Sequence, residues 1–369
     1  MKSLKILFLL LPFLSFSQDL NELIGQAQYA YTAKNYKMAS ETYQKAIAME
    51  DISNYFVYYY AALSANLNHE EDLAIKMLQK ATSKGFGLED NEIEFIQNMP
   101  DFANLHSKDE WKKVISEMKN QNTANKEKIQ KASEDWKKNL YDNAKIKPGY
   151  TLLFQKVDTV DFPYLVYVPK SPKQKSKLPV IVFLHGGTGL TNFKELYENP
   201  ELQSEPIFTT ARILNAIVIY PIARESFNWY NNEKSFEAIM QILNGFESKY
   251  KYDKKNVVLG GMSIGGRATF WFAQHHPKLF KGFYTFSAIP KLEFEPLDFS
   301  KFDTTRPIIS INTKDDATYK IDDVLKIYNQ HKFDKWSMEV LDSGTHGFIY
   351  NSAVDGQEKV TETLKKLLE

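Results

Sequence analysis

A serine between glycines is the residue best placed to do chemistry. The segment Gly-Met-Ser-Ile-Gly at 261–265 follows the apolar run 257–259 and precedes a helical pattern. A strand, a sharp turn and a helix in this order lift a serine hydroxyl above a sheet, and the glycines let the turn close. The helix N-terminus beside it favours developing negative charge. The pattern predicts Ser263 as a nucleophile; the alternative is an ordinary serine in a glycine-rich turn.

A histidine and two glycines follow another apolar run. Residues 180–184 have the pattern of a buried strand, and His185, Gly186 and Gly187 come directly after it. A glycine pair at a strand exit lets a backbone N–H turn toward a reacting oxygen, which is how an oxyanion hole is built. We assign the hole to the amides of Ile264 and of Gly187 or a neighbour, and we give His185 a structural role.

The orienting acid should follow a later strand, because a nucleophilic serine needs a base that a carboxylate holds in place. Asp315 and Asp316 stand at the exit of the apolar run 307–311. Asn312 lies three residues before Asp315, where glycine is usual, and asparagine tolerates a left-handed backbone. Asp315 is therefore the preferred acid, and Asp316 is interpreted as a solvated loop charge.

The base should come last in the chain. His346 lies in a loop between Gly344 and Gly347, after the alternating run 336–341, and no other of the seven histidines has both features. The resulting order, serine then aspartate then histidine, differs from the orders of the two common serine-protease folds. His346 is therefore the predicted general acid/base.

The elements around these residues predict the sheet that positions them. Apolar runs at 164–168, 179–184, 216–220, 256–260, 282–286 and 307–311 alternate with helical patterns such as 235–250 and 267–275. Strands that are apolar throughout and alternate with helices indicate a mainly parallel sheet with helices on both faces. Ligands of such α/β sheets bind at the carboxyl ends of the strands, where the residues named above fall.

Taken together, residues 150–369 resemble the α/β-hydrolase superfamily. Within it they are similar to the branch of feruloyl esterases, polyhydroxyalkanoate depolymerases and prolyl-oligopeptidase-like peptidases. Tyr252-Asp253 and Trp229 add to this similarity. The resemblance implies Ser263 as nucleophile, His346 as general acid/base and Asp315 as its orienter. We place this catalytic domain at 148–369.

The first part of the chain predicts stacked helix pairs. Four positions recur with an offset of 35 residues: Ala27 and Ala62, Ala39 and Ala74, Tyr43 and Leu78, Ala46 and Ala81. A fixed period with small residues at matching places is typical of helical repeats. The segments 36–46 and 73–81 resemble the second helix of tetratricopeptide repeats. We therefore expect a repeat domain at 18–120, with 89–119 as a third unit or cap, then a connecting helix or linker at 121–147; a plain helical bundle is the alternative.

The N-terminus has the pattern of a secretory signal peptide. Lys2 and Lys5 precede the apolar run 6–16, and small residues occupy 15 and 17. This pattern predicts a signal peptide at 1–17, cleaved before Gln18, and a periplasmic or secreted protein. The run is too short to span a bilayer, which takes about 20 apolar residues.

Composition excludes several function classes. Lys and Arg together number 46, and so do Asp and Glu. This balance of charges argues against nucleic acid as a partner. The chain has no cysteine, so disulfides and thiolate metal sites are ruled out. Neither a metal-ligand spacing of His and carboxylates nor a dinucleotide-binding Gly-x-Gly-x-x-Gly motif is recognised, so we expect no metal and no cofactor.

We therefore predict a serine hydrolase that cleaves carboxylic esters, small or polymer-derived, through an acyl-serine intermediate. A serine peptidase of the prolyl-oligopeptidase-like branch and a non-catalytic binding protein on a hydrolase fold are the alternatives. Such peptidases usually have a propeller or another gate, whereas the partner domain here is short and helical, which favours an ester. The repeats either serve in packing alone or dock a protein or peptide partner.

Overall fold

The computed structural model describes residues 11–141, 145–170, 177–188, 193–223, 229 and 233–369 of the chain. The chain divides into a first unit, Met1–Lys131, and a second unit, Ala132–Glu369. Residues 1–10 of the predicted signal peptide lie outside the described part, so its cleavage stays a prediction. Within the described ranges, no helix combines the length and the apolar character needed to cross a membrane.

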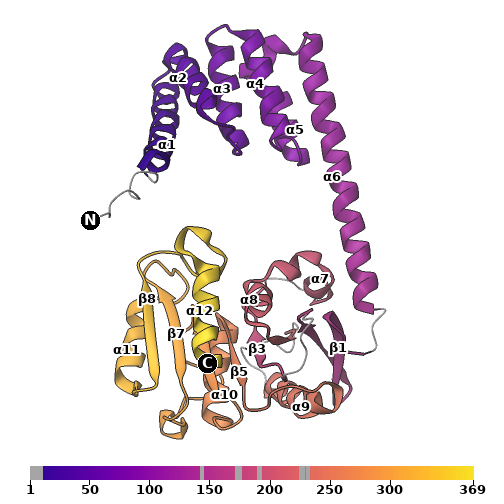
Figure 1. Cartoon of the computed structure of the whole chain (residues 1–369), viewed down its shortest axis with the longest axis vertical. Helices are drawn as coiled ribbons and strands as arrows, with labels where there is room; N and C mark the ends of the chain where they lie inside the picture. The colour runs from indigo at the N-terminus through magenta and orange to yellow at the C-terminus, as the bar shows by residue number, and fades with distance from the viewer. Residues whose placement is uncertain (1–10, 142–144, 171–176, 189–192, 224–228, 230–232) are drawn as a thin grey trace, which may run out of the picture. The chain divides into compact units, whose positions relative to one another are not determined.

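The first unit consists of helices (Figure 1). They are α1 (Leu11–Thr32), α2 (Tyr36–Met49), α3 (Tyr55–Leu67), α4 (Glu71–Ser83), α5 (Asp90–Asn98), a 3-10 turn η1 (Pro100–Leu105) and the first part of α6 (Asp109–Tyr141). The recurring alanines predicted to lie between helices are all fully buried: Ala27, Ala39, Ala46, Ala62, Ala74 and Ala81. The region therefore fits a helical-repeat domain, as the period of 35 residues indicated.

Helix α6 differs from the predicted boundary at 120. It runs from Asp109 to Tyr141 as one helix, because no glycine or proline interrupts its sequence. Trp111 packs in the core of the first unit, whereas Trp136 and Leu140 pack in the second. The Trp136 indole also donates a hydrogen bond to the carbonyl of Tyr197 at 2.9 Å. Residues 121–141 of the expected connecting segment are thus the C-terminal part of a longer helix.

The second unit is built on one sheet of eight strands. The strands are β1 (Gly149–Val157), β2 (Val160–Val168), β3 (Val180–Leu184), β4 (Ile217–Pro221), β5 (Val257–Met262), β6 (Gly282–Phe286), β7 (Ile308–Thr313) and β8 (Trp336–Leu341). Their order is β1-β2-β4-β3-β5-β6-β7-β8; the β1–β2 and β2–β4 pairs are antiparallel, and the other pairs are parallel. This is the strand order of the α/β-hydrolase fold. Strand β1 is an addition to the strands expected from the sequence.

Helices cover both faces of the sheet (Figure 1). Side chains alternate along each strand, so in β3 Val182 joins one core and Phe183 joins the other. Helices α9 (Glu233–Lys249) and α10 (Ile264–His275) pack on the first face. Helices α7 (Phe193–Glu198), α8 (Pro206–Leu214) and α12 (Gly356–Leu368) pack on the second. Helix α11 (Ile321–His331) connects β7 to β8, and short 3-10 turns lie at 200–204, 299–301, 348–350 and 352–354.

Candidate active site

Ser263 sits at the turn between β5 and α10. Its φ of 54° and ψ of −119° place it in a region that L-residues rarely adopt. The flanking glycines are required sterically, because a Cβ on Gly261 or on Gly265 would overlap the carbonyl oxygen of Leu184. The close approach of β3 to this turn therefore forces glycine on both sides and places the serine hydroxyl at the carboxyl edge of the sheet.

His346 connects the serine to a carboxylate. Its Nε2 lies 2.7 Å from Ser263 Oγ, and its Nδ1 lies 2.8 Å from Asp316 Oδ2. An ionised carboxylate accepts hydrogen bonds and donates none, so we assign the ring proton to Nδ1. Nε2 then has a free lone pair, which accepts the proton of the serine hydroxyl. The three side chains form one hydrogen-bonded series across the exits of β5, β7 and β8.

The carboxylate in this series is Asp316, so the preference for Asp315 is wrong. The side chain of Asp316 is fully buried, and its Oδ1 accepts hydrogen bonds from the amides of Thr318 at 2.7 Å and Tyr319 at 3.0 Å. Asp315 bonds to the backbone of the loop just before His346 and not to its ring. The two aspartates are neighbours of the same type, and the direction of each side chain depends on the loop backbone, which the position of Asn312 does not reveal.

Asp315 has a separate structural role. Its carboxylate accepts hydrogen bonds from the amide of Thr345 at 2.8 Å and from that of Gly344 at 3.1 Å. These bonds hold the pKa of Asp315 below its usual value, and the bond from Thr345 has the largest effect. Asp315 therefore supports the loop that carries His346 and does not contact the imidazole.

The exit of β3 lies beside Ser263. A Cβ built on Gly186 would stand 3.5 Å from the Cβ of Ser263. Ile264 is the first residue of α10, so its amide is one of the free N–H groups of that helix N-terminus. The space beside Gly187 is open within the part of the chain that the structure describes. The assignment of the amides of Gly187 and Ile264 to an oxyanion hole stays a prediction.

His185 is structural, because both of its ring nitrogens are occupied by the backbone. Nδ1 lies 2.6 Å from the carbonyl oxygen of Gly186, and Nε2 accepts a hydrogen bond from the amide of Ala223 at 3.0 Å. Burial lowers the pKa of His185 to about 4, so the ring is neutral. It joins the exit of β3 to the exit of β4 and cannot serve as the base.

Tyr319 and Arg267 are residues at the site that the sequence patterns did not reveal. The ring of Tyr319 packs edge-on against the imidazole of His346, with centroids 5.4 Å apart. The guanidinium carbon of Arg267 lies 5.8 Å from the centroid of the same tyrosine ring. Arg267 is itself held by the carboxylate of Glu293 at 2.8 Å and the carbonyl of Lys291 at 2.6 Å. No sequence pattern marks such ring packing.

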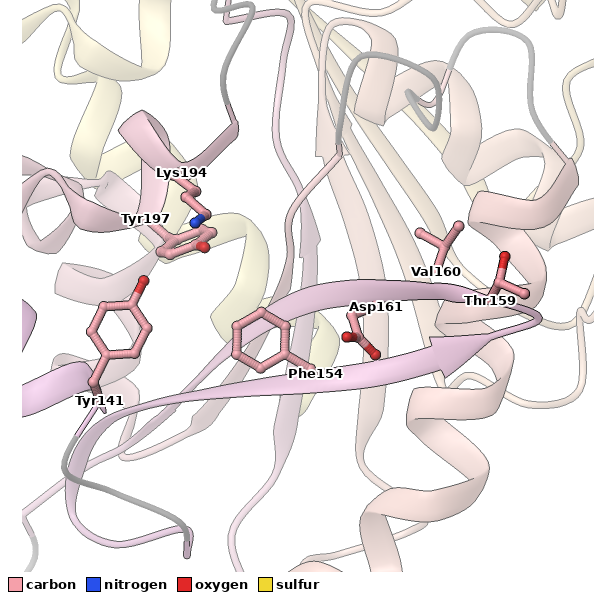
Figure 2. A pocket seen from close by; sticks show the side chains of 7 residues that line it. All are labelled: Tyr141, Phe154, Thr159, Val160, Asp161, Lys194 and Tyr197. Carbon is pink, nitrogen blue, oxygen red and sulfur yellow. The ribbon is translucent and has the colours of Figure 1, made fainter.

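A hollow of about 430 Å³ lies at the same edge of the sheet. We call it the aromatic hollow; it is lined by Tyr141, Phe154, Thr159, Val160, Asp161, Lys194 and Tyr197. The start of β2 extends beyond the carboxyl end of β4, because Tyr164 pairs with Pro221 in antiparallel register. Figure 2 shows the three aromatic rings around the hollow, with Asp161 next to Phe154. About half of the surface of Phe154 is exposed there.

In the described part of the chain, no three His, Asp or Glu residues gather in a way that could hold a metal ion. A serine, an imidazole and a buried carboxylate, joined in that order at the carboxyl edge of this sheet, are the arrangement of the α/β-hydrolase class of proteins.

Comparisons with known proteins gave structural likenesses. No family model matches the sequence, and no curated protein matches it. The chain is similar to a thermostable esterase, at 21% identity and a TM-score of 0.43 over 58% of this chain and 60% of that one. It is also similar to the fluorophosphonate-binding serine hydrolase F of Staphylococcus aureus, at 16% identity and a TM-score of 0.46 over 60% of this chain and all of that one. The acylaminoacyl peptidase of Pyrococcus horikoshii has 17% identity and a TM-score of 0.45 over 62% of this chain and 43% of that one.

Proposed function

We propose that the chain is a serine hydrolase that cleaves carboxylic esters through an acyl-serine intermediate. The observation that carries the proposal is the hydrogen-bonded series Ser263–His346–Asp316, with the serine on a strained turn at the carboxyl edge of the sheet. Each bond runs in the direction that general-base activation of a serine requires.

The geometry supports a two-step reaction. Ser263 Oγ attacks the ester carbonyl while His346 Nε2 takes its proton, and the amides of Gly187 and Ile264 are the proposed donors to the oxyanion. His346 then gives the proton to the departing alkoxide, which leaves Ser263 acylated. In the second step His346 takes a proton from water, the resulting hydroxide attacks the acyl group, and Ser263 regains its proton as the acid leaves. Asp316 stays ionised and holds the imidazole tautomer throughout.

An ester is the preferred substrate over a peptide. In its described residues the first unit has helices and no propeller blades, whereas peptidases of the prolyl-oligopeptidase-like branch usually have a propeller or another gate. The aromatic hollow offers rings and hydrogen-bonding groups for a remote part of the substrate. The signal-peptide pattern supports action outside the cytoplasm; that placement, like the acyl and alcohol specificity, is part of the proposal.

The sharpest test compares two neighbouring carboxylates. Asp316→Asn should lower kcat for a p-nitrophenyl ester by about 10³–10⁴-fold, because the amide cannot hold the Nδ1–H tautomer. Asp315→Asn is the matched control: it makes the same chemical change one residue away and should cost less than about tenfold, since it leaves His346 Nδ1 bonded. Ser263→Ala should lose about 10⁴-fold or more and should no longer react with a fluorophosphonate probe. Circular dichroism checks that each variant is folded.

Three results would overturn the proposal or a part of it. If Asp315→Asn were as damaging as Asp316→Asn, the geometric assignment of the acid would be wrong. If a matched p-nitroanilide were cleaved faster than every ester in an acetyl, feruloyl and hydroxyalkanoate panel, the enzyme would be an amidase or peptidase. Undiminished turnover and labelling in Ser263→Ala would remove Ser263 from the chemistry altogether.

A further inference from the structure

A second, larger hollow lies at the opposite edge of the sheet from Ser263. It measures about 730 Å³, and we call it the basic hollow; it is lined by Asn139, Lys147, Pro148, Gly149, Tyr150, Tyr167, Pro169, Lys170, Gln203, Arg212 and Asn215. The β1 start and the β2 end meet there, because Gly149 pairs with Val168. Strand β5 is six residues long, so about 20 Å separates this edge from the nucleophile at roughly 3.3 Å per residue. The basic hollow is therefore not part of the catalytic site.

The charges around the basic hollow have one sign. Lys147, Lys170 and Arg212 line it, and the described residues of its lining include no carboxylate. Among the residues that the structure describes, these three cations form no ion pair, although ion pairs are frequent elsewhere on the surface. The whole chain has equal numbers of cations and anions, so this local excess is a property of the site.

Hydrogen bonds hold the side chain of Arg212 and leave some of its N–H donors unused. Its Nη2 donates to Thr209 Oγ1 at 2.7 Å and its Nη1 donates to Tyr150 Oη at 3.3 Å. A guanidinium has five N–H donors, so donors remain for a ligand. Because the C-terminal end of α8 carries partial negative charge, attraction for an anion has to come from the side chains. A preorganised arginine with two lysines supplies that attraction.

The rest of the lining suits hydroxyl groups. The amides of Gln203 and Asn215 border the hollow, and the buried rings of Tyr150 and Tyr167 line it as well. A volume of 730 Å³ is within the range of sites for small organic ligands and is larger than one inorganic phosphate needs. Cations combined with amides and phenol hydroxyls match a ligand that carries both an oxyanion and several hydroxyls.

We propose that the basic hollow binds an acidic sugar unit, with the oxyanion on Arg212 and the two lysines and the hydroxyls on the amides. The oxyanion is either the carboxylate of a uronic acid or the phosphate of a sugar phosphate; both satisfy the same groups. This site is separate from the proposed hydrolase chemistry and places a second ligand contact on the far edge of the sheet.

Titration calorimetry on the full chain tests the proposal. The probes are galacturonate, glucose 6-phosphate, inorganic phosphate and glucose. We expect one of the two acidic sugars to bind, with an affinity that falls as salt rises, and glucose not to bind. Arg212→Gln and the double variant Lys147→Gln/Lys170→Gln should each weaken binding by about tenfold or more. Turnover of a small ester should be unchanged in both, because Ser263 is about 20 Å away.

The matched control is the double variant Lys251→Gln/Lys335→Gln, which removes the same charge from exposed positions outside the hollow. It should keep the affinity of the unmodified chain. An equal loss in this control would mean that net charge and not the hollow drives binding. Inorganic phosphate binding as tightly as either sugar would overturn the hydroxyl part of the proposal, and binding of neither acidic sugar would overturn it entirely.

Discussion

Acidification should destabilise the second unit through His185. The imidazole has two backbone partners of opposite kind: the carbonyl of Gly186 can only accept from Nδ1, and the amide of Ala223 can only donate to Nε2. These bonds are satisfied together by the neutral ring with its proton on Nδ1. A second proton on Nε2 would face the Ala223 N–H, and the ring packs between Tyr220 and Trp229 without access to water.

The magnitude follows from the pKa. Burial lowers the pKa of His185 from 6.5 to about 4. Below pH 6.5 the unfolded chain binds a proton at this residue that the folded chain refuses until about pH 4, so stability falls as pH falls through this window. The difference between 6.5 and about 4, at roughly 1.4 kcal/mol per pH unit, is about 3.5 kcal/mol. About 2.5 kcal/mol of it should already be lost at pH 4.5.

Urea unfolding of the unmodified chain and of His185→Gln at pH 7.5, 6, 5 and 4.5 measures this contribution. Four of the five tryptophans lie in the second unit, so fluorescence reports mainly on it. Glutamine can still accept from Ala223 N–H and does not titrate, and every other ionisable group is common to both chains. The variant should be less stable at pH 7.5, and its deficit should shrink by about 2.5 kcal/mol at pH 4.5. Parallel stability curves across the range would refute the reasoning.

Five further variants test other parts of the second unit. Tyr319→Ala should lower kcat for a small ester by about tenfold with little change in KM, because the ring restricts His346, and Tyr319→Phe should restore it; equal losses in both would argue against packing as the cause. Gly265→Ala should cost about 3 kcal/mol or more in urea unfolding, since its Cβ would overlap a backbone oxygen, whereas Gly245→Ala has free space in a helix and should stabilise by about 0.5–1 kcal/mol. Phe154→Ala should raise KM for esters with a bulky ring and leave the acetyl ester unaffected; unchanged KM for all would separate the aromatic hollow from the substrate.

The buried strands were predictable because burial on two faces leaves a continuous apolar signal. The runs at 179–184 and 282–286 agree closely with β3 and β6 for this reason. Strand β1 gave no such signal, because it pairs on one side with β2 and exposes Phe154 and neighbouring polar residues. The glycines of the turn between β5 and α10 were equally informative, since a backbone oxygen of β3 fills the space where a side chain at 261 or 265 would go.

The choice between Asp315 and Asp316 was beyond the sequence, because it depends on which way a loop turns. In the structure both carboxylates bond to the loop that carries His346. Asp316 bonds to the His346 ring, while Asp315 bonds to the two backbone amides just before it, at Gly344 and Thr345. The spacing of the residues locates the exit of β7. It does not show which of two adjacent aspartates bonds to the ring and which to the backbone.

That division has a physical reason in the backbone before His346. Gly344 has a φ of 133° and Thr345 a φ of 61°, conformations that need support from their surroundings. Asp315 supplies it through two amides, and Thr313 adds a hydrogen bond from its hydroxyl to the carbonyl of Thr345 at 3.0 Å. The backbone of His346 is thus held in place by these bonds. The hydrogen bond to Asp316 then only needs to orient the imidazole ring. Losing Asp315 should loosen the loop and still leave an imidazole that can reach Ser263, which is why its asparagine variant is the fitting control for that of Asp316.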